Sequence, residues 1–422
     1  MATDYNRARH NYLKRRAIAG PWQLEGDSAA CRGAVVIPAL AEGDELFTTL
    51  NSLAANPVPN LKHWLVAVIV NRCDADSSAA ASNQRDLERL RNYTGPLRLA
   101  WVDANSPGLA LPDKNGGVGM ARKIAADLLL PRLTATAPLI HLDADTPVAN
   151  NYLPAIDTFF AAANRHAAVI NYRHRSATDA TAAAITSYEI YLRCHVLGLR
   201  YAASPYAFHT IGSTMASTAA AYISAGGMNR RRGGEDFYFM QQLAKCGPVE
   251  AITATCVYPS ARISRRAPFG TGQIIAAGSD AVRYYPPQCY ISLDIMLKTV
   301  NRLIDADAAA ILTELERPRA THLGVTARFL RHAGFSDVWQ HLCATHTSPQ
   351  RRRRAFNEWF DALKTIRLFH YLDQHGFPRG SAATILPQLL PLLGLPAASA
   401  AAMDNLLETL RTLDNQPVAL SH

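Results

Sequence analysis

Short runs of apolar residues alternate with amphipathic stretches over the first third of the chain, and this alternation limits the folds that are open to it. Apolar runs with little polar interruption are typical of strands that are buried on both faces. The predicted strands are 34–38, 65–70, 97–102 and 138–142, and the predicted helices between them are 45–55, 84–91 and 118–130. Strands that alternate with helices predict an α/β fold, with a mostly parallel sheet flanked by helices.

The pattern changes near residue 291. Helical periodicity over 292–313, 325–332 and 349–372 predicts an α-helical C-terminal appendage. The first thirty residues are polar and basic, and contain no apolar core of a secretory signal. We therefore expect a basic N-terminal arm, an α/β domain and a helical region, with the boundaries 1–30, 31–290 and 291–422.

Composition excludes several classes of protein. Hydrophobic residues make up 49% of the 422 residues, which is too much for general disorder. The net charge of +9 is spread along the chain, so no nucleic acid is expected as a partner. Seven scattered cysteines without a CxxC pair indicate reduced thiols and a cytoplasmic protein. Prolines interrupt the apolar stretch 380–403, so no membrane-spanning helix is expected; peripheral contact with an inner membrane stays open.

The acidic motif Asp143-Ala144-Asp145 directly follows the fourth predicted strand. Ligands of parallel α/β sheets bind at the carboxyl ends of the strands, so we expect this loop at the binding edge. Two carboxylates one residue apart suit a hard divalent cation such as Mg²⁺ or Mn²⁺, which can bridge a diphosphate. The alternative is a pair of ordinary surface acids or helix caps.

Glycines precede a second acidic pair. Gly226-Gly227 and Gly233-Gly234 come before Glu235 and Asp236, which open a predicted helix over 237–246. Glycine lets the backbone approach a ligand closely, and a carboxylate that does not bind the metal can act as a general base. Acidic residues at the start of a helix also stabilise the helix dipole without any catalytic role.

An arginine-rich loop follows further along the chain. Arg262, Arg265 and Arg266 precede a glycine-rich turn, and guanidinium groups can close over phosphate oxygens. The alternative is a basic loop in solvent.

A glycine loop marks the start of the third predicted helix. Lys114 lies before it and Arg122 and Lys123 lie after it. A glycine loop with basic groups at a helix N-terminus is a natural anion site. The alternative is a simple helix start with Arg122 and Lys123 in solvent.

In their order, these motifs resemble those of family 2 glycosyltransferases with the GT-A fold, including a bacterial subgroup of them. The resemblance rests on the segments 35–42, 119–123, 142–145 and 234–236, and covers roughly residues 31–272. It implies a GT-A-like nucleotide-sugar-binding catalytic domain. It also implies a metal-dependent, inverting transfer of a sugar from a nucleotide diphosphate donor to a hydroxyl acceptor, which is a sugar, a lipid-linked molecule or a small molecule.

The motifs and the resemblance together assign a role to each candidate residue. The donor contacts are Pro38, Ala39, Glu42, Asn71, Asp74, Asp76, Lys114, Arg122, Asp143, Arg262, Arg265 and Arg266. Asp145 and Asp143 would hold Mn²⁺ or Mg²⁺. Asp236 would take the proton of the acceptor hydroxyl, and Glu235 would orient the acceptor. The acceptor contacts are His209, Gly226 and Gly227; His209 is alternatively a third metal ligand or a locally packed side chain.

The sequence departs from the family pattern at three points. Ala41 replaces the usual asparagine of the opening motif, and Asn71 stands where many relatives have a base-contacting aspartate, which leaves the nucleotide base open. No QxxRW motif follows Asp236, which argues against a processive synthase embedded in a membrane.

Two other functions remain as alternatives. A nucleotidyltransferase would have a glycine- and basic-rich loop directly after the first strand, where this chain has residues 39–43, Ala-Leu-Ala-Glu-Gly. A non-catalytic nucleotide-sugar-binding or scaffold protein would not need the acids that this chain has in both acidic motifs.

Overall fold

The computed structural model describes residues 2–175, 179–262, 271–317, 320–396 and 403–414. The chain divides into two compact units, each built from two segments of the chain. The first unit contains residues 1–178 and 208–276, and the second contains 179–207 and 277–422. The sequence predicts one domain over 31–290, whereas residues 179–207 and 277–290 belong to the second unit.

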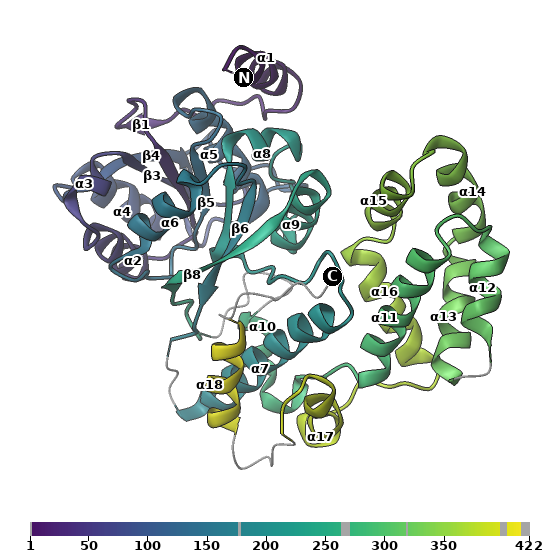
Figure 1. Ribbon diagram of the computed structural model, residues 1–422. Helices are drawn as coiled ribbons and strands as arrows, with labels where there is room; N and C mark the ends of the chain where they lie inside the picture. Colours follow the sequence, from purple (N-terminus) through teal and green to yellow (C-terminus); the bar gives the residue numbers. More distant parts are fainter. Residues whose placement is uncertain (1, 176–178, 263–270, 318–319, 397–402, 415–422) are drawn as a thin grey trace. The chain divides into compact units, whose positions relative to one another are not determined.

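A mixed sheet forms the centre of the first unit (Figure 1), and the described residues contribute eight strands to it in the order β1-β4-β3-β2-β5-β7-β6-β8. The strands are β1 (Glu25–Gly26), β2 (Gly33–Ala39), β3 (Trp64–Asn71), β4 (Arg98–Ala104), β5 (Pro138–His141), β6 (Ala167–Tyr172), β7 (Met215–Thr218) and β8 (Val249–Val257). Strands β2 to β5 run parallel, as do β6 and β8, whereas β1 and β7 are antiparallel to their neighbours. The mostly parallel sheet expected from the sequence is confirmed.

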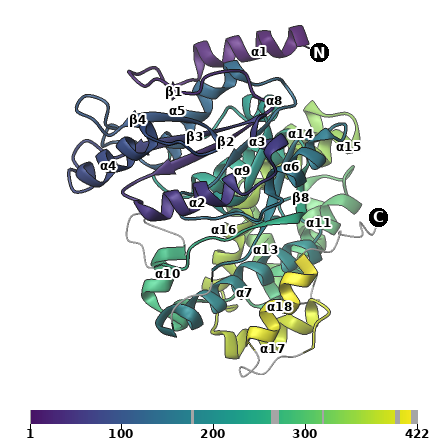
Figure 2. The ribbon, with the colours of Figure 1, turned by 90° about the vertical axis from the view of Figure 1, so that its left-hand side faces the viewer.

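Helices cover both faces of this sheet (Figures 1 and 2). The described helices of the first unit are α1 (Ala2–Arg15), α2 (Asp44–Ala54), α3 (Val58–Leu61), α4 (Ala80–Arg91), α5 (Val118–Leu129), α6 (Tyr152–Ala161), α8 (Ala219–Ser224) and α9 (Glu235–Cys246), and α10 (Thr271–Ala277) spans the unit boundary at residue 276. On one face, Val36 and Ile69 of the sheet share a buried apolar cluster with Ile124 of α5, Tyr222 of α8 and Phe239 of α9. This packing fixes the start of α5 and the start of α9 at the same edge of the sheet.

The basic N-terminal arm expected from the sequence is largely a helix, α1, that packs on the first unit. Its two tyrosines are buried. The hydroxyl of Tyr5 donates to the carbonyl of Leu133 at 3.2 Å, and that of Tyr12 donates to Oδ1 of Asp127 at 2.8 Å. Because the tyrosines lie on one side of the helix, the arginines and lysines of α1 are left on its exposed sides.

The second unit is helical in its described residues, which confirms the expected helical C-terminal region. Its helices are α7 (Asp179–Tyr201), α11 (Pro287–Arg302), α12 (Ala308–Glu316), α13 (Thr321–His332), α14 (Phe335–Thr345), α15 (Pro349–Trp359), α16 (Ala362–Gln374), α17 (Ala382–Leu392) and α18 (Met403–Asp414). The predicted helices 292–313 and 349–372 are each broken in two, where Asp307 caps α12 and Asp361 caps α16. None of the described helices is both long and apolar enough to cross a membrane.

Buried charges join the two segments of the second unit. Arg193 of α7 is fully buried; its guanidinium lies 2.8 Å from Oε1 of Glu189 and 2.8 Å from Oδ2 of Asp414 in α18. Arg411 of α18 lies 2.7 Å from the same Glu189 oxygen. Removing one member of such a buried set leaves an uncompensated charge, so α7 and α18 depend on each other.

Candidate active site

The loop after β5 carries the first acidic motif to the edge of the sheet. The backbone N–H of Leu142 donates to the carbonyl of Val36 at 3.0 Å, which continues the β2–β5 pairing to the residue before Asp143. The carboxylate of Asp143 accepts hydrogen bonds on both oxygens, from Arg122 on Oδ1 and from the hydroxyl of Ser213 on Oδ2 at 2.5 Å. Asp143 is therefore held in one orientation by protein groups.

Arg122 links this loop to the second acidic motif. Its side chain, on α5, is only 1% exposed. Besides the bond to Asp143, its Nη1 donates to the carbonyl of Gly212 at 2.9 Å, and its Nε lies 3.8 Å from Oε1 of Glu235. Burial alone would lower the pKa of Arg122, but the carboxylates of Asp143 and Glu235 raise it above its ordinary value. The guanidinium thus stays charged and connects two carboxylates that are far apart in sequence.

Two glycines allow these groups to approach one another. A Cβ on Gly212 would lie 2.7 Å from Nη2 of Arg122. A Cβ on Gly119 would lie 2.7 Å from the carbonyl of Asn229 and 3.0 Å from Cβ of Glu235. Since real Cβ atoms do not approach this closely, larger residues at either position would push the acidic motifs away from Arg122.

The second acidic pair opens α9, after Gly234 turns the backbone through a left-handed conformation (φ 70°). Burial, and then the neighbouring charge of Asp236, raise the pKa of Glu235 to about 7 against the opposing effect of Arg122. Burial also raises the pKa of Asp236 to about 6, and the charge of Asp143 adds to this effect. Glu235 is buried, whereas the residue Asp236 is partly exposed.

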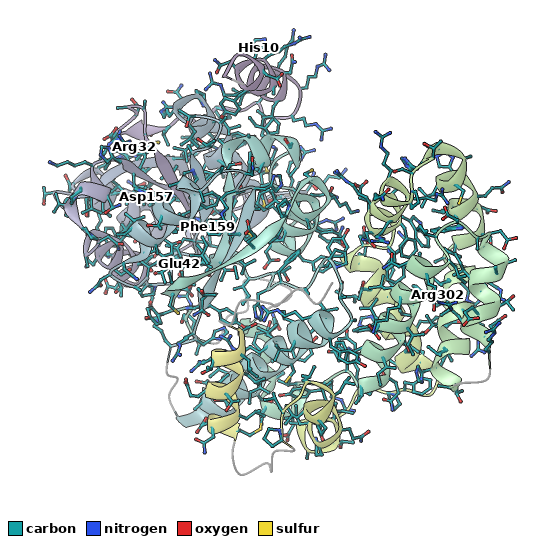
Figure 3. The ribbon with its side chains drawn as sticks, in the orientation of Figure 1. His10, Arg32, Glu42, Asp157, Phe159 and Arg302 are labelled. Atoms are coloured by element: carbon teal, nitrogen blue, oxygen red, sulfur yellow. The ribbon has the colours of Figure 1, made fainter. Side chains whose placement is uncertain are left out.

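Asp145 belongs to a second ionic group at the same edge. Oδ2 of Asp145 lies 2.9 Å from Nε of Arg262, whose guanidinium also binds the carboxylate of Glu42 in the loop after β2 (Figure 3). Arg175 donates to the Asp145 carbonyl at 3.3 Å and to Glu45 at 2.7 Å. Burial raises the pKa of Asp145 to about 6 in spite of Arg262. Arg262 thus lies at the acidic motif, and its predicted contact with the donor stays a prediction; Arg265 and Arg266 lie outside the described residues.

The other predicted donor contacts follow the ends of β2 and β3. Pro38 and Ala39 are the last residues of β2, and Asn71 is the last residue of β3. The Oδ1 atom of Asn71 is buried and has no hydrogen-bond partner within the described part of the chain. A buried acceptor of this kind is normally satisfied, so a ligand that supplies a donor would complete it.

Three further donor contacts predicted from the sequence lie in exposed loops. Asp74 and Asp76 follow β3, and the carboxylate of Asp76 accepts from the hydroxyl of Ser78 at 2.6 Å. Lys114 is exposed in the loop before α5. Neither Asp74 nor Lys114 forms a side-chain hydrogen bond or ion pair within the described residues.

The predicted acceptor contacts lie in different surroundings. His209 is buried and packs edge-on against Tyr172, with ring centroids 5.0 Å apart and Nδ1 3.5 Å from the tyrosine hydroxyl. Gly226 and Gly227 both have left-handed backbones, and a Cβ on them would lie 2.9 Å from Nη1 of Arg16 and 3.0 Å from Nζ of Lys123, respectively. The two glycines therefore adjoin the end of α1 and the middle of α5.

Sequence reasoning missed some residues of this site. The alternative that Arg122 and Lys123 lie in solvent is wrong, because both are buried. Lys123 donates to the hydroxyl of Tyr12 at 2.6 Å and lies 3.1 Å from Oδ2 of Asp127. Ser213, which holds Asp143, is not among the residues predicted from the sequence. No local signal marks the contact of Ser213 with Asp143 or that of Lys123 with Tyr12, because the partners lie 70 and 111 positions apart.

No family model matches the chain, and no curated protein matches it. Among solved structures, S. aureus TarS in complex with UDP-GlcNAc is 13% identical, with a TM-score of 0.39 over 78% of this chain and 90% of that one. The mannosyltransferase PcManGT from Pyrobaculum calidifontis, in complex with GDP-Man and Mn²⁺, is 14% identical, with a TM-score of 0.37 over 86% of this chain and 96% of that one. The strand order and pairing of this chain confirm the α/β fold predicted from the sequence, with a mostly parallel sheet flanked by helices.

Proposed function

We propose that this chain is an inverting glycosyltransferase similar to family 2, which transfers a sugar from a nucleotide diphosphate donor to a hydroxyl acceptor. One observation carries the proposal. Four carboxylates from two distant motifs gather around two arginines at the edge where β2 and β5 end, and these acids are Asp143, Asp145, Glu235 and Asp236. In α/β sheets of this kind, ligands bind at the carboxyl ends of the strands.

The residues present fit a divalent cation that arrives with the donor. Both oxygens of Asp143 are engaged by Arg122 and Ser213, and the described residues hold no group of three or more histidine, cysteine or acidic side chains that could hold a metal ion. Mg²⁺ and similar cations are commonly bound by one or two carboxylates together with substrate phosphates. Asp145 would supply the carboxylate, with Asp143 beside it. When bound, the cation would neutralise charge on the leaving diphosphate.

Arg262 and Asn71 would bind the two ends of the donor nucleotide. The guanidinium of Arg262 can leave Asp145 and Glu42 for the diphosphate, because its fork matches phosphate oxygens as well as carboxylates. The unpartnered Oδ1 of Asn71 can accept a hydrogen bond from the base. Contacts with the donor from Pro38, Ala39, Asp74, Asp76, Lys114, Arg265 and Arg266 stay predictions, as do contacts with the acceptor from His209, Gly226 and Gly227.

Asp236 would act as the general base. With its pKa raised to about 6, it is still mostly ionised at neutral pH, and it is a stronger proton acceptor than an ordinary aspartate. As the acceptor oxygen forms its bond to the anomeric carbon, its proton passes to Asp236. The bond between that carbon and the diphosphate oxygen breaks on the opposite face, and the electron pair leaves with the nucleotide diphosphate. Glu235, held at Arg122, would orient the acceptor.

The direct test incubates the whole chain with Mn²⁺, a panel of sugar nucleotides and a panel of hydroxyl acceptors, and measures released nucleotide diphosphate. Donor-dependent release that needs an acceptor and disappears in Asp236→Asn is expected. Release that persists unchanged in that variant contradicts the base assignment, and binding of sugar nucleotides without any release supports the scaffold alternative. Pyrophosphate formed from a nucleoside triphosphate and a sugar phosphate would support a nucleotidyltransferase instead.

A further inference from the structure

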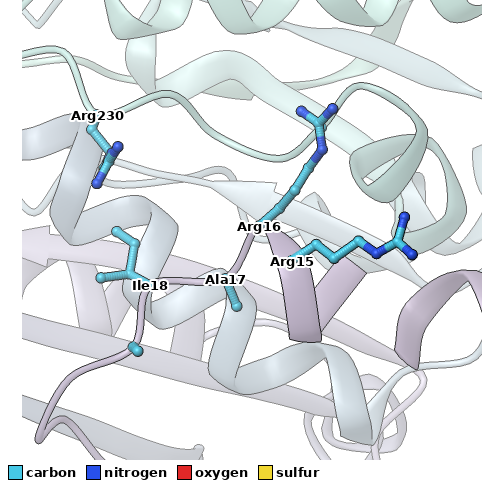
Figure 4. A pocket seen from close by; sticks show the side chains of 7 residues that line it. Arg15, Arg16, Ala17, Ile18 and Arg230 are labelled. Atoms are coloured by element: carbon cyan, nitrogen blue, oxygen red, sulfur yellow. The ribbon is translucent and has the colours of Figure 1, made fainter. Parts of the chain in front are cut away.

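A pocket in the first unit is lined by arginines and by none of the four carboxylates described above. It has a volume of about 420 Å³ and lies where α1 ends (Figure 4). Arg15 and Arg16 come from the end of α1, and Arg230 comes from the segment that leads into α9. Ile18 and Gly226 complete the wall at this point. Two separate segments of the chain thus contribute three arginines to the wall of one cavity, and the Arg15 side chain points away from Arg230 (Figure 4).

The positive charge of this pocket is not balanced by the protein. In the part of the chain that the structure describes, none of these three guanidinium groups forms an ion pair or a side-chain hydrogen bond. The acid nearby is Asp127, and it is already bound by Lys123, Tyr12 and Tyr222. Burial lowers the pKa of Lys123, and the charges of Arg230 and Arg16 lower it further. Arg16 and Arg230 are therefore close enough to Lys123 to affect its pKa.

The arginines are held in place by structured backbone. Arg16 follows α1, which is fixed by Tyr5 and Tyr12, and its backbone N–H donates to the carbonyl of Tyr12 at 2.8 Å. Opposite it, Gly226 and Gly227 turn the backbone with φ of 83° and 76°. A side chain at Gly226 would meet the Arg16 guanidinium, since its Cβ would lie 2.9 Å from Nη1. Glycine at position 226 therefore leaves room for the Arg16 side chain, which a larger residue at this position would not.

The neighbouring arginines of the same segment point elsewhere. The guanidinium of Arg231 stacks over the ring of Tyr238, 3.7 Å from its centroid. Arg232 lies beside Gly117 at the start of α5. Arg230 alone of this run lines the pocket, so the pocket does not follow simply from a run of basic residues.

We propose that this pocket binds a phosphate group, carried by a phosphorylated small molecule or by a phospholipid headgroup. Guanidinium groups bind phosphate oxygens in a bidentate way, and Arg16 and Arg230, which both act on Lys123, can share a group that carries two negative charges. A bound phosphate would also relieve the repulsion between cations that have no acidic partner. The pocket is a second site beside the donor site of the proposed function, and phosphate binding there does not depend on sugar transfer.

The test compares three forms of the whole chain. The pocket variant is Arg16→Gln/Arg230→Gln, and the matched control is Arg7→Gln/Arg32→Gln, which removes the same charge from exposed arginines outside the pocket (Arg32, Figure 3). One arm measures binding of inorganic pyrophosphate by calorimetry, with EDTA present to suppress metal-assisted binding at the donor site. The other arm measures sedimentation with phosphatidylglycerol vesicles, and phosphatidylcholine vesicles serve as the uncharged reference. Thermal unfolding checks that each variant is folded.

We expect the wild type and the control to bind at least one probe, and the pocket variant to bind it at least about tenfold more weakly. Binding of pyrophosphate alone identifies a soluble phosphate as the ligand, and binding of anionic vesicles alone identifies a lipid headgroup. The proposal is wrong if the wild type binds neither probe. It is equally wrong if the pocket variant binds like the wild type, or if the control loses as much affinity as the pocket variant.

Discussion

Arg262 lies against Asp145, with its Nε 2.9 Å from the carboxylate Oδ2, and the same guanidinium binds Glu42. A positive charge therefore already occupies the neighbourhood in which the proposed cation would bind. A cation and the arginine repel each other there, so binding of the donor must move Arg262 from the carboxylates to the phosphates.

Replacing this arginine should separate two binding events. In Arg262→Gln, Asp145 loses its positive neighbour, so Mn²⁺ alone should bind more tightly than to the wild type. The nucleotide diphosphate should bind about tenfold or more weakly, because a charged contact with phosphate is lost. Calorimetric titrations with each ligand measure both effects. Arg175→Gln, which retains the Asp145–Arg262 pair, is the comparison; unchanged binding of both ligands to Arg262→Gln would contradict the proposed movement.

Arg122 should be essential for stability. In Arg122→Met, Asp143 and Glu235 lose the buried cation between them, and the free energy of unfolding should fall by about 3 kcal/mol. Asp143 is 34% exposed, so part of its charge would be screened by water. Arg89→Gln is the matched control, because its ion pair with Asp44 lies at the surface and should contribute less than about 1 kcal/mol. Urea unfolding measures the loss in the free energy of unfolding for both variants. Equal losses would argue against a special role for Arg122.

The proposed base can be separated from its neighbour by conservative changes. Asp236→Asn should lower the rate of transfer by about 10²- to 10⁴-fold and leave nucleotide binding nearly unchanged, because the base acts only on the acceptor proton. Glu235→Gln should raise the KM for the acceptor more than it lowers kcat. The control is Asp113→Asn, which removes one negative charge from an exposed position before α5. A fully active Asp236→Asn enzyme would exclude this carboxylate as the base.

The pH dependence of the reaction should follow the same carboxylate. A base works only when ionised, and the pKa of Asp236 is raised to about 6 by burial. The value of kcat/KM should therefore rise with pH through about 6. Initial rates from pH 5 to about 8 test this. A profile that stays nearly flat over this range, as expected for an ordinary aspartate with a pKa of about 4, would contradict it.

The raised pKa values of Asp236, Glu235 and Asp145 also predict that stability falls as the pH rises, whereas the reaction rate increases. These carboxyl groups hold their protons more tightly in the native state than in the unfolded chain, so their ionisation favours unfolding. The free energy of unfolding should therefore decrease as the pH rises from about 4, where ordinary carboxyls ionise, and Asp236→Asn should reduce this slope. Urea titrations at several pH values provide the measurement, and identical slopes in the two proteins would contradict the assigned pKa shift.

The strands at the centre of the sheet were predictable because their sequences are continuous apolar runs. Residues 65–70 are such a run, and the strand there is β3. By contrast, β7 has the sequence Met-Ala-Ser-Thr and pairs antiparallel between β5 and β6. Small polar residues in a four-residue strand give no pattern, and tertiary pairing alone determines its structure.

The acidic residues of the site were predictable from their positions after a strand and before a helix, but their environment was not. Glycines before Glu235 and an apolar run before Asp143 are local signals. The contact between Arg122 and Asp143 joins residues 21 positions apart, and the arginine pocket is lined by Arg230 together with residues at the distant end of α1. Helix α1 was missed for a similar reason. Its sequence is polar, and its helical form depends on two tyrosines that find buried partners elsewhere.

The sharing of α7 with the C-terminal helices has a practical consequence for anyone who wishes to study the sheet unit alone. A protein shortened after residue 276 would still carry α7, but would lack Asp414 and Arg411, which balance Arg193 and Glu189 on it. Such a fragment would present a charged and apolar helix to solvent, and we expect it to aggregate. A soluble version requires a short linker in place of residues 179–207 as well as the C-terminal cut.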